Sequence, residues 1–495
     1  MDATQSLRYF GPELVLTAAI MAVLALDLGL TARGIERSRW PGIVALAGAA
    51  AAIGSAVRLL RVPAREWLFG RMLVFDGFSV YFKVLLGLAL LAAVWMSLGS
   101  REVRGQPNEG EYFTLLLSSG LAMLLMAAAA NLLMAYLSLE FASLTSYVLT
   151  GFLRHNRRSA EAALKYLIYG GVASGAMIYG MSWIFGLTGS MDYAGIAAGI
   201  AQLDDPSRGA FFLALVLVLA GFGYKVASVP FHMWAPDVYT GAPIPVTAFL
   251  AVGSKAAGFA MLLRFFHFGV GAAGPVGAVT RVPLLQLGTL LCAATMTLGN
   301  LAALSQQNMK RLLAYSSIAH AGYALLGFVV FADAGVQAVL FYLTVYYIMN
   351  LGAFWVVMLI ANATGHEDLP SYRGLAWRGG ALPALALAIF LFSLAGLPPL
   401  AGFVGKFYVF GAGVERGLIA LVVVGVLNSV VSLYYYVRVV KTMFLDEPRA
   451  EDAPVHFALN DLAAVGLLSA ATLVLGIRFD WLLARVETAR RIFAG

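Results

Sequence analysis

A lysine beside a helix break is the feature of this sequence that most clearly indicates chemistry. Lys225 follows the apolar run from Phe211 to Ala220, and a lysine deep in a bilayer costs roughly 2.5–3.5 kcal/mol on insertion scales. Its side chain should therefore face protein or water. Pro230 has no backbone N–H, and Gly221 and Gly223 loosen the helix before it. A spanning helix broken beside a buried charge is how transporters build an ion site near the bilayer midplane.

The same ingredients return later in the chain. Gly396 and the pair Pro398-Pro399 should break a second apolar helix, and Lys406 follows a few residues later. Two broken helices, each with one lysine, are therefore expected at the centre of the molecule.

Further ionisable residues occupy other apolar stretches. Glu140 shares one face of its predicted helix with Tyr136, Ser143 and Tyr147, which gives a polar stripe on an otherwise apolar helix. Fold stability does not require such groups, so we expect them to form a polar axis that runs sideways through a helix bundle. The other members of the predicted axis are Lys165, Lys255 and His320.

Proton transfer is the chemistry that suits these residues. Burial disfavours the charged form of a lysine, and a nearby carboxylate favours it, so Glu140 could make Lys225 bind or release a proton. No activated nucleophile or phosphate-binding loop accompanies them, which indicates a proton switch rather than a catalytic dyad. Two candidates also have a structural interpretation. His320 could be a packing histidine, and Lys165 could be an ordinary i,i+4 partner of Glu161.

Membrane-spanning helices are the elements that must position these residues. The chain has 495 residues, of which 61% are hydrophobic and only 12% are charged, whereas a soluble domain has about 25% charged residues. We expect an all-α polytopic membrane protein with about fourteen transmembrane helices, the seventh and twelfth broken. The expected spans are 13–30, 41–60, 78–99, 112–129, 131–152, 161–187, 209–227, 244–266, 283–304, 312–331, 335–361, 381–408, 416–440 and 459–477.

Composition argues against several other classes of protein. The net charge of +7 comes from lysines and arginines spread over short loops, which favours orientation signals over nucleic-acid binding. The single Cys292 excludes an intramolecular disulfide and a cysteine-ligated cluster, and the six histidines form no HxxxH or HExxH pair. We therefore expect no metal or cofactor in this chain.

Loop charges predict the orientation of the chain in the membrane. The loop after the fifth span carries Arg154, Arg157 and Arg158, whereas the loop after the sixth carries Asp204 and Asp205. Loops after odd-numbered spans are therefore predicted to be cytoplasmic, which places both termini in the periplasm. The arginines of the C-terminal tail run against this rule, as do Arg58, Arg61, Arg65 and Arg71.

The spacing of the ionisable residues indicates an internal repeat. Glu140 and His320 are 180 residues apart, and Lys225 and Lys406 are 181 apart. An odd number of spans separates the two halves, so we expect two inverted five-helix repeats, spans 4–8 and 9–13. The predicted organisation is N-terminal spans 1–3 (1–108), the first repeat (109–270), the second repeat (271–445), and span 14 with the C-terminal tail (446–495).

Six stretches combine these residues into motifs with a known resemblance. Together they reach from about the second span to the fourteenth, and with them the chain resembles the antiporter-like membrane subunits of respiratory complex I, the NADH-quinone oxidoreductase. It resembles the subunit N family most, because subunit M has a glutamate where Lys406 stands and subunit L adds a long lateral helix. The motifs are Leu139-Glu140, Ser159–Tyr166, Lys225 with Pro230–Tyr239, Gly241–Val246, Arg311–His320 and Gly402–Lys406.

The resemblance implies a role in proton translocation. Glu140 would pair with Lys225, Lys165 and Lys255 would carry the central relay, and Lys406 would connect to the next antiporter-like unit or to the outside. Quinone reduction elsewhere in the complex would supply the energy. NAD, FMN, iron–sulfur clusters and quinone would belong to partner subunits. The implied partners are membrane-arm subunits of the M, L, K, J, A and H types, in a bacterial inner membrane.

Three other functions remain open at this point. A subunit of a sodium/proton antiporter would share the same core, and so would a membrane-arm subunit of a related hydrogenase or ferredoxin-driven complex. A small-molecule transporter fits less well, because a solute site needs a central cavity with mixed polar and aromatic lining rather than a lateral row of lysines.

Overall fold

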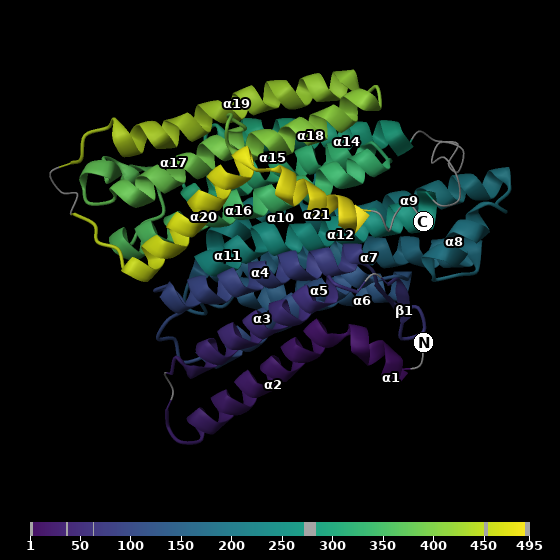
Figure 1. The fold of residues 1–495 in the computed structure, drawn as a ribbon, viewed down its shortest axis with the longest axis horizontal. Coiled ribbons are helices and arrows are strands. Elements are labelled where there is room, and N and C mark those ends of the chain that lie inside the picture. Colours follow the sequence, from purple (N-terminus) through teal and green to yellow (C-terminus); the bar gives the residue numbers. More distant parts are fainter. Residues whose placement is uncertain (1–2, 36–37, 63, 272–283, 450–453, 491–495) are drawn as a thin grey trace.

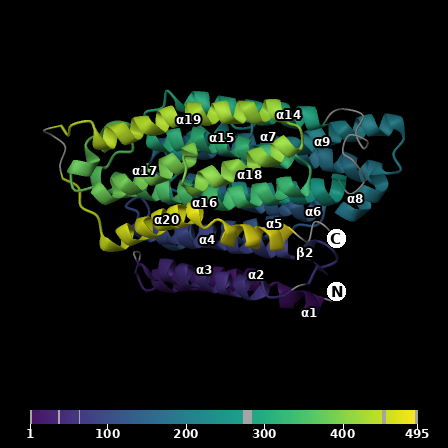
Figure 2. The same ribbon diagram turned by 45° about the horizontal axis from the view of Figure 1, so that its top comes forward.

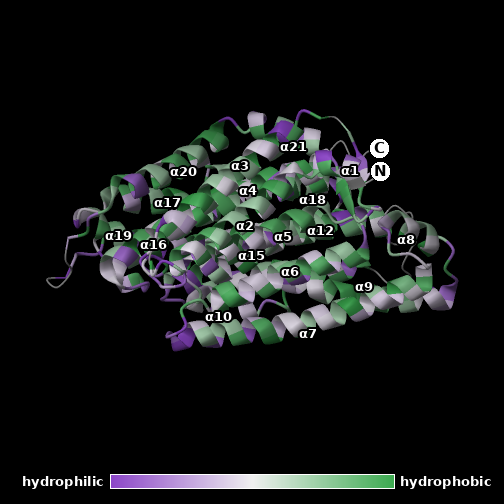
Figure 3. Cartoon of the chain, turned by 90° about the horizontal axis from the view of Figure 1, so that it is seen from below, coloured by the Kyte–Doolittle hydropathy of each residue, from purple (hydrophilic) through white to green (hydrophobic). Residues whose placement is uncertain are grey.

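The computed structural model describes residues 3–35, 38–62, 64–271, 284–449 and 454–490, which form an oblong bundle of long helices (Figure 1). Helices α2 and α3 lie along one edge of the bundle, and α19 lies along the other (Figures 1 and 2). Apolar residues dominate the helices, and polar residues gather at their ends (Figure 3). Thirteen described helices are long and apolar enough to cross a membrane, and a bent pair raises the number to fourteen, as predicted. The chain is a multi-pass membrane protein.

The first three spans, α2, α3 and α4, come from the N-terminal part of the chain. The Asp76 side chain caps α4 by accepting a hydrogen bond from the Ser79 N–H at 2.7 Å. A short antiparallel hairpin precedes this cap and pairs Trp67 with Val74, a feature that the hydropathy pattern does not indicate. The elements are α1 (Ala3–Ser6), η1 (Leu7–Tyr9), α2 (Gly11–Thr31), α3 (Trp40–Leu59), β1 (Glu66–Leu68), β2 (Leu73–Phe75) and α4 (Gly77–Gly99).

The next segment contains the first helix break. Helix α9 ends because Ala227 adopts a left-handed conformation and Pro230 follows, and the chain becomes helical again at Trp234. The elements are α5 (Glu109–Ala128), α6 (Leu132–Thr150), α7 (Arg157–Thr188), α8 (Tyr193–Ile200), α9 (Asp205–Val226), α10 (Trp234–Gly241), α11 (Ile244–Phe249), η2 (Leu250–Ser254), α12 (Lys255–Arg264) and η3 (Phe265–Val270).

The following segment contains the second break and ends with the helices α20 and α21. Helix α17 ends at Gly396, which has a φ of 90° that suits glycine, and α18 begins after the two prolines. The elements are α14 (Leu284–Ala303), α15 (Met309–Val329), α16 (Asp333–Thr364), η5 (Leu369–Tyr372), η6 (Leu375–Trp377), α17 (Ala381–Ala395), α18 (Ala401–Glu415), α19 (Ile419–Phe444), α20 (Leu459–Ile477) and α21 (Asp480–Arg490).

The two halves contain equivalent features in the same order. Asn131 caps α6 and Asn308 caps α15, and each of these asparagines forms an isolated β-bridge, to Asp192 and to Asp368 respectively. The long helices α7 and α16 that follow each have 32 residues. Each half then has one broken helix, so the repeat of elements agrees with the prediction.

The equivalence of individual residues differs from the predicted offset. The breaks at Ala227 and Gly396 are 169 residues apart, whereas Lys225 and Lys406 are 181 apart. As a result, Lys225 lies in α9 before its break, and Lys406 lies in α18 beyond the second break. The two lysines occupy opposite sides of their breaks.

Candidate functional site

Lys225 lies in a closely packed site between three helices. Its side chain is 1% exposed, and its Nζ donates a hydrogen bond to Ser143 Oγ of α6 at 3.3 Å. Its aliphatic part packs against α12, because a Cβ at Gly258 would lie 3.2 Å from Lys225 Cγ. Gly258 is three residues after Lys255, so the helix that packs against Lys225 also carries the second lysine.

Glu140 lies one turn before Ser143 on the same helix. Its Oε1 is buried and has no hydrogen-bond partner, and no ion pair to a lysine or arginine within 4.0 Å is found for Glu140 among the described residues. The Lys225 Nζ donates its hydrogen bond to Ser143 rather than to Glu140, and the Glu140 carboxylate acts on the lysine through its charge.

Lys255 is held by the middle of α15. Its Nζ donates to the Ser317 carbonyl oxygen at 2.6 Å and also to Ser317 Oγ. The Tyr346 hydroxyl of α16 donates to the same Ser317 Oγ at 2.8 Å, and the Tyr239 hydroxyl of α10 lies 3.5 Å from it. Ser317 therefore joins three helices to the lysine.

His320 lies one turn further along α15. Its Nδ1 is 2.6 Å from the Tyr342 hydroxyl, and its Nε2 is 3.3 Å from the Tyr436 hydroxyl. Tyr436 in turn lies 2.5 Å from Ser316 Oγ. Both ring nitrogens of a buried histidine thus meet groups that can donate or accept a proton.

Lys406 ends the series. Its Nζ donates to the Ala395 carbonyl oxygen at 2.9 Å, a carbonyl in the last turn of α17 before the break, and to Ser429 Oγ at 2.8 Å. It also lies 4.5 Å from the centre of the Tyr323 ring. Lys255 and Lys406 therefore contact carbonyls, hydroxyls and an aromatic ring, and each could gain or lose a proton without breaking an ion pair.

These contacts form three hydrogen-bonded groups, around Lys255, His320 and Lys406, which lie next to one another and which we together call the polar row. Ser316 and Ser317 are adjacent, and the His320 ring lies 5.1 Å from the Tyr346 ring and 5.6 Å from the Tyr323 ring. The row thus crosses from α12 to α18 and α19 through α15 and α16. Its members are Lys255, Ser316, Ser317, His320, Tyr323, Tyr342, Tyr346, Lys406, Ser429 and Tyr436.

Lys165 occupies a different place, near the start of α7. Its side chain is 39% exposed, and its Nζ pairs with Glu161 at 2.8 Å and with Asp237 at 2.7 Å. Asp237 also pairs with Arg311 at 2.6 Å. The i,i+4 pair is thus present, but Asp237 is the group that joins Lys165 to a second cation.

The sequence argument missed most partners of the lysines. Tyr346 and Tyr342 were recognisable as polar positions inside an apolar helix, but which hydroxyl meets which nitrogen depends on how α15, α16 and α19 pack. Asp237 had one available signal, since it is an acidic residue directly after a helix break. Among the described residues, no cluster of three or more histidine, cysteine, aspartate or glutamate side chains could hold a metal.

Comparisons with known proteins agree with this architecture. The family described as NADH:quinone oxidoreductase/Mrp antiporter, TM matches residues 129–432. NADH-quinone oxidoreductase subunit N 2 of Sorangium cellulosum is 50% identical over 493 residues, which cover 96% of this chain and 96% of that protein. A chain of respiratory complex I from Thermus thermophilus is 34% identical, with a TM-score of 0.79, over 96% of this chain and 98% of that chain.

A more distant structure shares the fold. A chain of the Mrp complex from a Dietzia species superposes with a TM-score of 0.84 at 23% identity, and the match covers 98% of this chain and 97% of that chain. The family match covers more than half of the chain, and the 50% identity extends over nearly its full length. This chain therefore belongs to the subunit N family of NADH-quinone oxidoreductases, the antiporter-like membrane subunits of complex I.

Proposed function

We propose that this chain moves protons along the polar row, as a membrane-arm subunit of NADH-quinone oxidoreductase driven by quinone reduction in other subunits. The observation that carries the proposal is the row itself. Two buried lysines on different helices are joined by serines, tyrosines and a histidine, with successive polar atoms within hydrogen-bond reach over most of its length. Membership of the subunit N family supports the same function.

Each charged residue has a proposed role. Glu140 and Lys225 act as the switch, in which a change in their separation or in the Ser143 contact alters the charge of the lysine. Lys255 receives the proton, His320 passes it on, and Lys406 delivers it toward the neighbouring subunit or the outside. Lys165 takes part by exchanging between Glu161 and Asp237, which would change the charge beside α10.

The setting of the chain is part of the proposal. NAD, FMN, iron–sulfur clusters and quinone belong to partner subunits, and the M, L, K, J, A and H types are the proposed neighbours. The domains follow the predicted divisions at 108, 270 and 445. Both termini are proposed to be periplasmic in a bacterial inner membrane, which agrees with α1 and α21 reaching the same end of the bundle (Figure 1).

Lys255 offers the experiment that tests the function. Lys255→Arg keeps a positive charge that cannot be released, and Lys255→Met keeps the volume without charge. We expect both variants to assemble and to lose proton pumping by about a hundredfold or more, because a positioned proton-transfer group is removed. Acidification of proteoliposomes is measured beside subunit content. Wild-type pumping by the arginine variant would reject the proposal, and sodium-driven pumping would favour the sodium/proton antiporter.

A further inference from the structure

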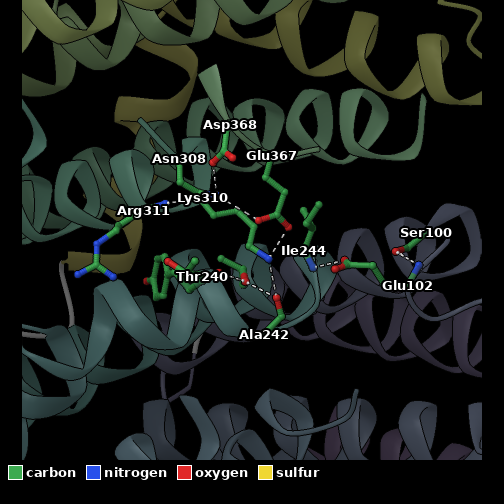
Figure 4. Close-up of polar contacts among 12 residues, drawn as sticks. Ser100, Glu102, Thr240, Ala242, Ile244, Asn308, Lys310, Arg311, Glu367 and Asp368 are labelled. Atoms are coloured by element: carbon green, nitrogen blue, oxygen red, sulfur yellow. Dashed lines mark hydrogen bonds and ion pairs between the residues drawn. The ribbon is translucent and has the colours of Figure 1, made fainter. Parts of the chain in front are cut away.

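A second group of buried charges lies at one end of the bundle, outside the polar row. Lys310 is buried near the start of α15 and pairs with Glu367 Oε1 at 2.7 Å. Its Nζ also donates to the Ala242 carbonyl oxygen at 2.9 Å, so the lysine lies between Glu367 and the elbow that joins α10 to α11 (Figure 4). We define this elbow as residues 241–244.

Glu102 holds the same elbow through a different peptide group. Its Oε2 accepts a hydrogen bond from the Ile244 N–H at 2.8 Å (Figure 4). Ile244 is the first residue of α11, so this N–H has no acceptor within the helix, and the carboxylate also lies at the positive end of the helix dipole. One buried cation and one partly buried anion therefore fix two backbone groups of a four-residue elbow.

The cluster of Glu102, Lys310 and Glu367 has a net charge of −1 when all three side chains are charged. Lys310 contributes one positive charge, and Glu102 and Glu367 contribute two negative ones, so the binding of one proton would make the group neutral. Lys310 pairs with Glu367, which leaves Glu102 as the less compensated carboxylate. Burial raises the pKa of Glu102, while the Lys310 ammonium and the Ile244 N–H act in the opposite direction and Glu367 raises it further. Tyr112 of α5 is a further titratable group that interacts with Glu102.

The elbow connects this cluster to the polar row. Lys310 and Ser317 are seven residues apart on α15, which places them on the same face about 10 Å apart along the helix axis. On the other side, α11 leads from the elbow to Lys255, and α10 carries Tyr239, whose hydroxyl lies 3.5 Å from Ser317 Oγ. The Glu367 side chain is 22% exposed, so the cluster is in contact with solvent through this residue.

We propose that Glu102, Lys310 and Glu367 form the proton-loading site of this subunit, in which Glu102 takes up the proton and Lys310 and Glu367 position it. The proposal rests on the proposed function, since it supplies the polar row with protons. A proton from bulk hydronium binds the Glu102 carboxylate, water is left behind, and the cluster becomes neutral. Neutral Glu102 holds the Ile244 N–H less strongly, which frees the elbow. The same proton then passes to Lys255 of the row, which becomes positively charged as Glu102 becomes a carboxylate again.

Glu102→Gln separates loading from a purely structural cap. The glutamine keeps the volume and an oxygen that can accept the Ile244 hydrogen bond, but it cannot carry a proton. We expect the assembled complex to keep its subunit content and to lose most of its proton pumping. Glu111→Gln is the matched control, because Glu111 stands nine residues away at the start of α5 in an exposed pair with Arg154, and it should pump normally.

The dependence of pumping on pH gives a second readout. In the wild-type complex, proton uptake should fall as pH rises through the pKa of Glu102, because the carboxyl group is then no longer protonated. Glu102→Gln should remove this step from the profile. A glutamine variant with wild-type pumping and a wild-type pH profile would overturn the loading site. If Lys255→Arg had lost pumping in the same preparation, the proposed function would still stand, whereas normal pumping by Lys255→Arg would reject that function itself.

Discussion

Complex I that carries Lys225→Ala is expected to assemble and to lose proton pumping by about a hundredfold or more, as happens when a positioned proton-transfer group is removed. The assembly should survive because the hydrogen-bond partner of Lys225 is a neutral hydroxyl. Among the described residues, no ion pair within 4.0 Å joins Lys225 to Glu140, so the substitution breaks no close buried ion pair, which would be the costly outcome. Ser143 Oγ keeps its hydrogen bond to the Leu139 carbonyl oxygen at 2.7 Å. The measurements are subunit content and acidification of proteoliposomes.

Two further variants show whether the proton or the charge of Lys225 matters. Lys225→Arg keeps the charge but cannot release its proton, so it should fail to pump like the alanine variant. Ser143→Ala removes only the hydroxyl and should pump at an intermediate rate. Normal pumping with alanine at 225 would end the account of this residue as a switch, and full rescue by arginine would reduce its role to that of a fixed charge.

Arg264→Met is expected to be the most destabilising single substitution. The guanidinium donates to both oxygens of Asp76 at 2.7 and 3.0 Å and to the Ala127 carbonyl oxygen at 3.2 Å, with arginine and aspartate both buried. Removal of the cation leaves Asp76 charged and buried, which costs about 3–5 kcal/mol. The pair joins α12 to the start of α4, so this loss should appear as a low yield of assembled subunit and a lower melting temperature.

A double substitution is the control for this pair. Burial alone would raise the pKa of Asp76, but the Arg264 guanidinium and the Ser79 N–H hold this pKa below its usual range. The stabilisation is therefore present at neutral pH and is lost as pH falls through the lowered pKa. Asp76→Asn with Arg264→Met removes both charges and should recover much of the yield. A single Arg264→Met variant as stable as the wild type would contradict this reading of the pair.

The fold was predictable from sequence because its signals are local. Apolar runs of sufficient length identify membrane spans, and a left-handed glycine or a proline beyond the first turn ends a helix, as at Gly396 and Pro230. The same locality explains why Lys225 and Lys406 were recognisable as residues beside breaks. The hairpin at 66–75 was missed because it is too short to produce an alternating pattern.

Contacts between helices could not be predicted from the sequence. The repeat of elements between the two halves was predictable, but the breaks are 169 residues apart and Lys225 and Lys406, 181 residues apart, lie on opposite sides of them. Glu140 was expected to pair with Lys225; the hydrogen bond of the lysine goes to Ser143, one turn along the same helix, and Glu140 acts on the lysine through its charge. Asp237 forms its two ion pairs with residues more than 70 positions away, on α7 and α15.

The claim that the row is one continuous proton path is tested most directly by the pumping rates of Ser317→Ala, Tyr436→Phe and the double variant. Each substitution removes one hydroxyl, at Lys255 and at His320 respectively, and the two sites lie in series. We predict that each single variant slows pumping and that the two delays add in the double variant, since the times of consecutive steps add in a serial path. Unchanged pumping in both single variants, or two losses that multiply in the double variant, would contradict a single continuous row.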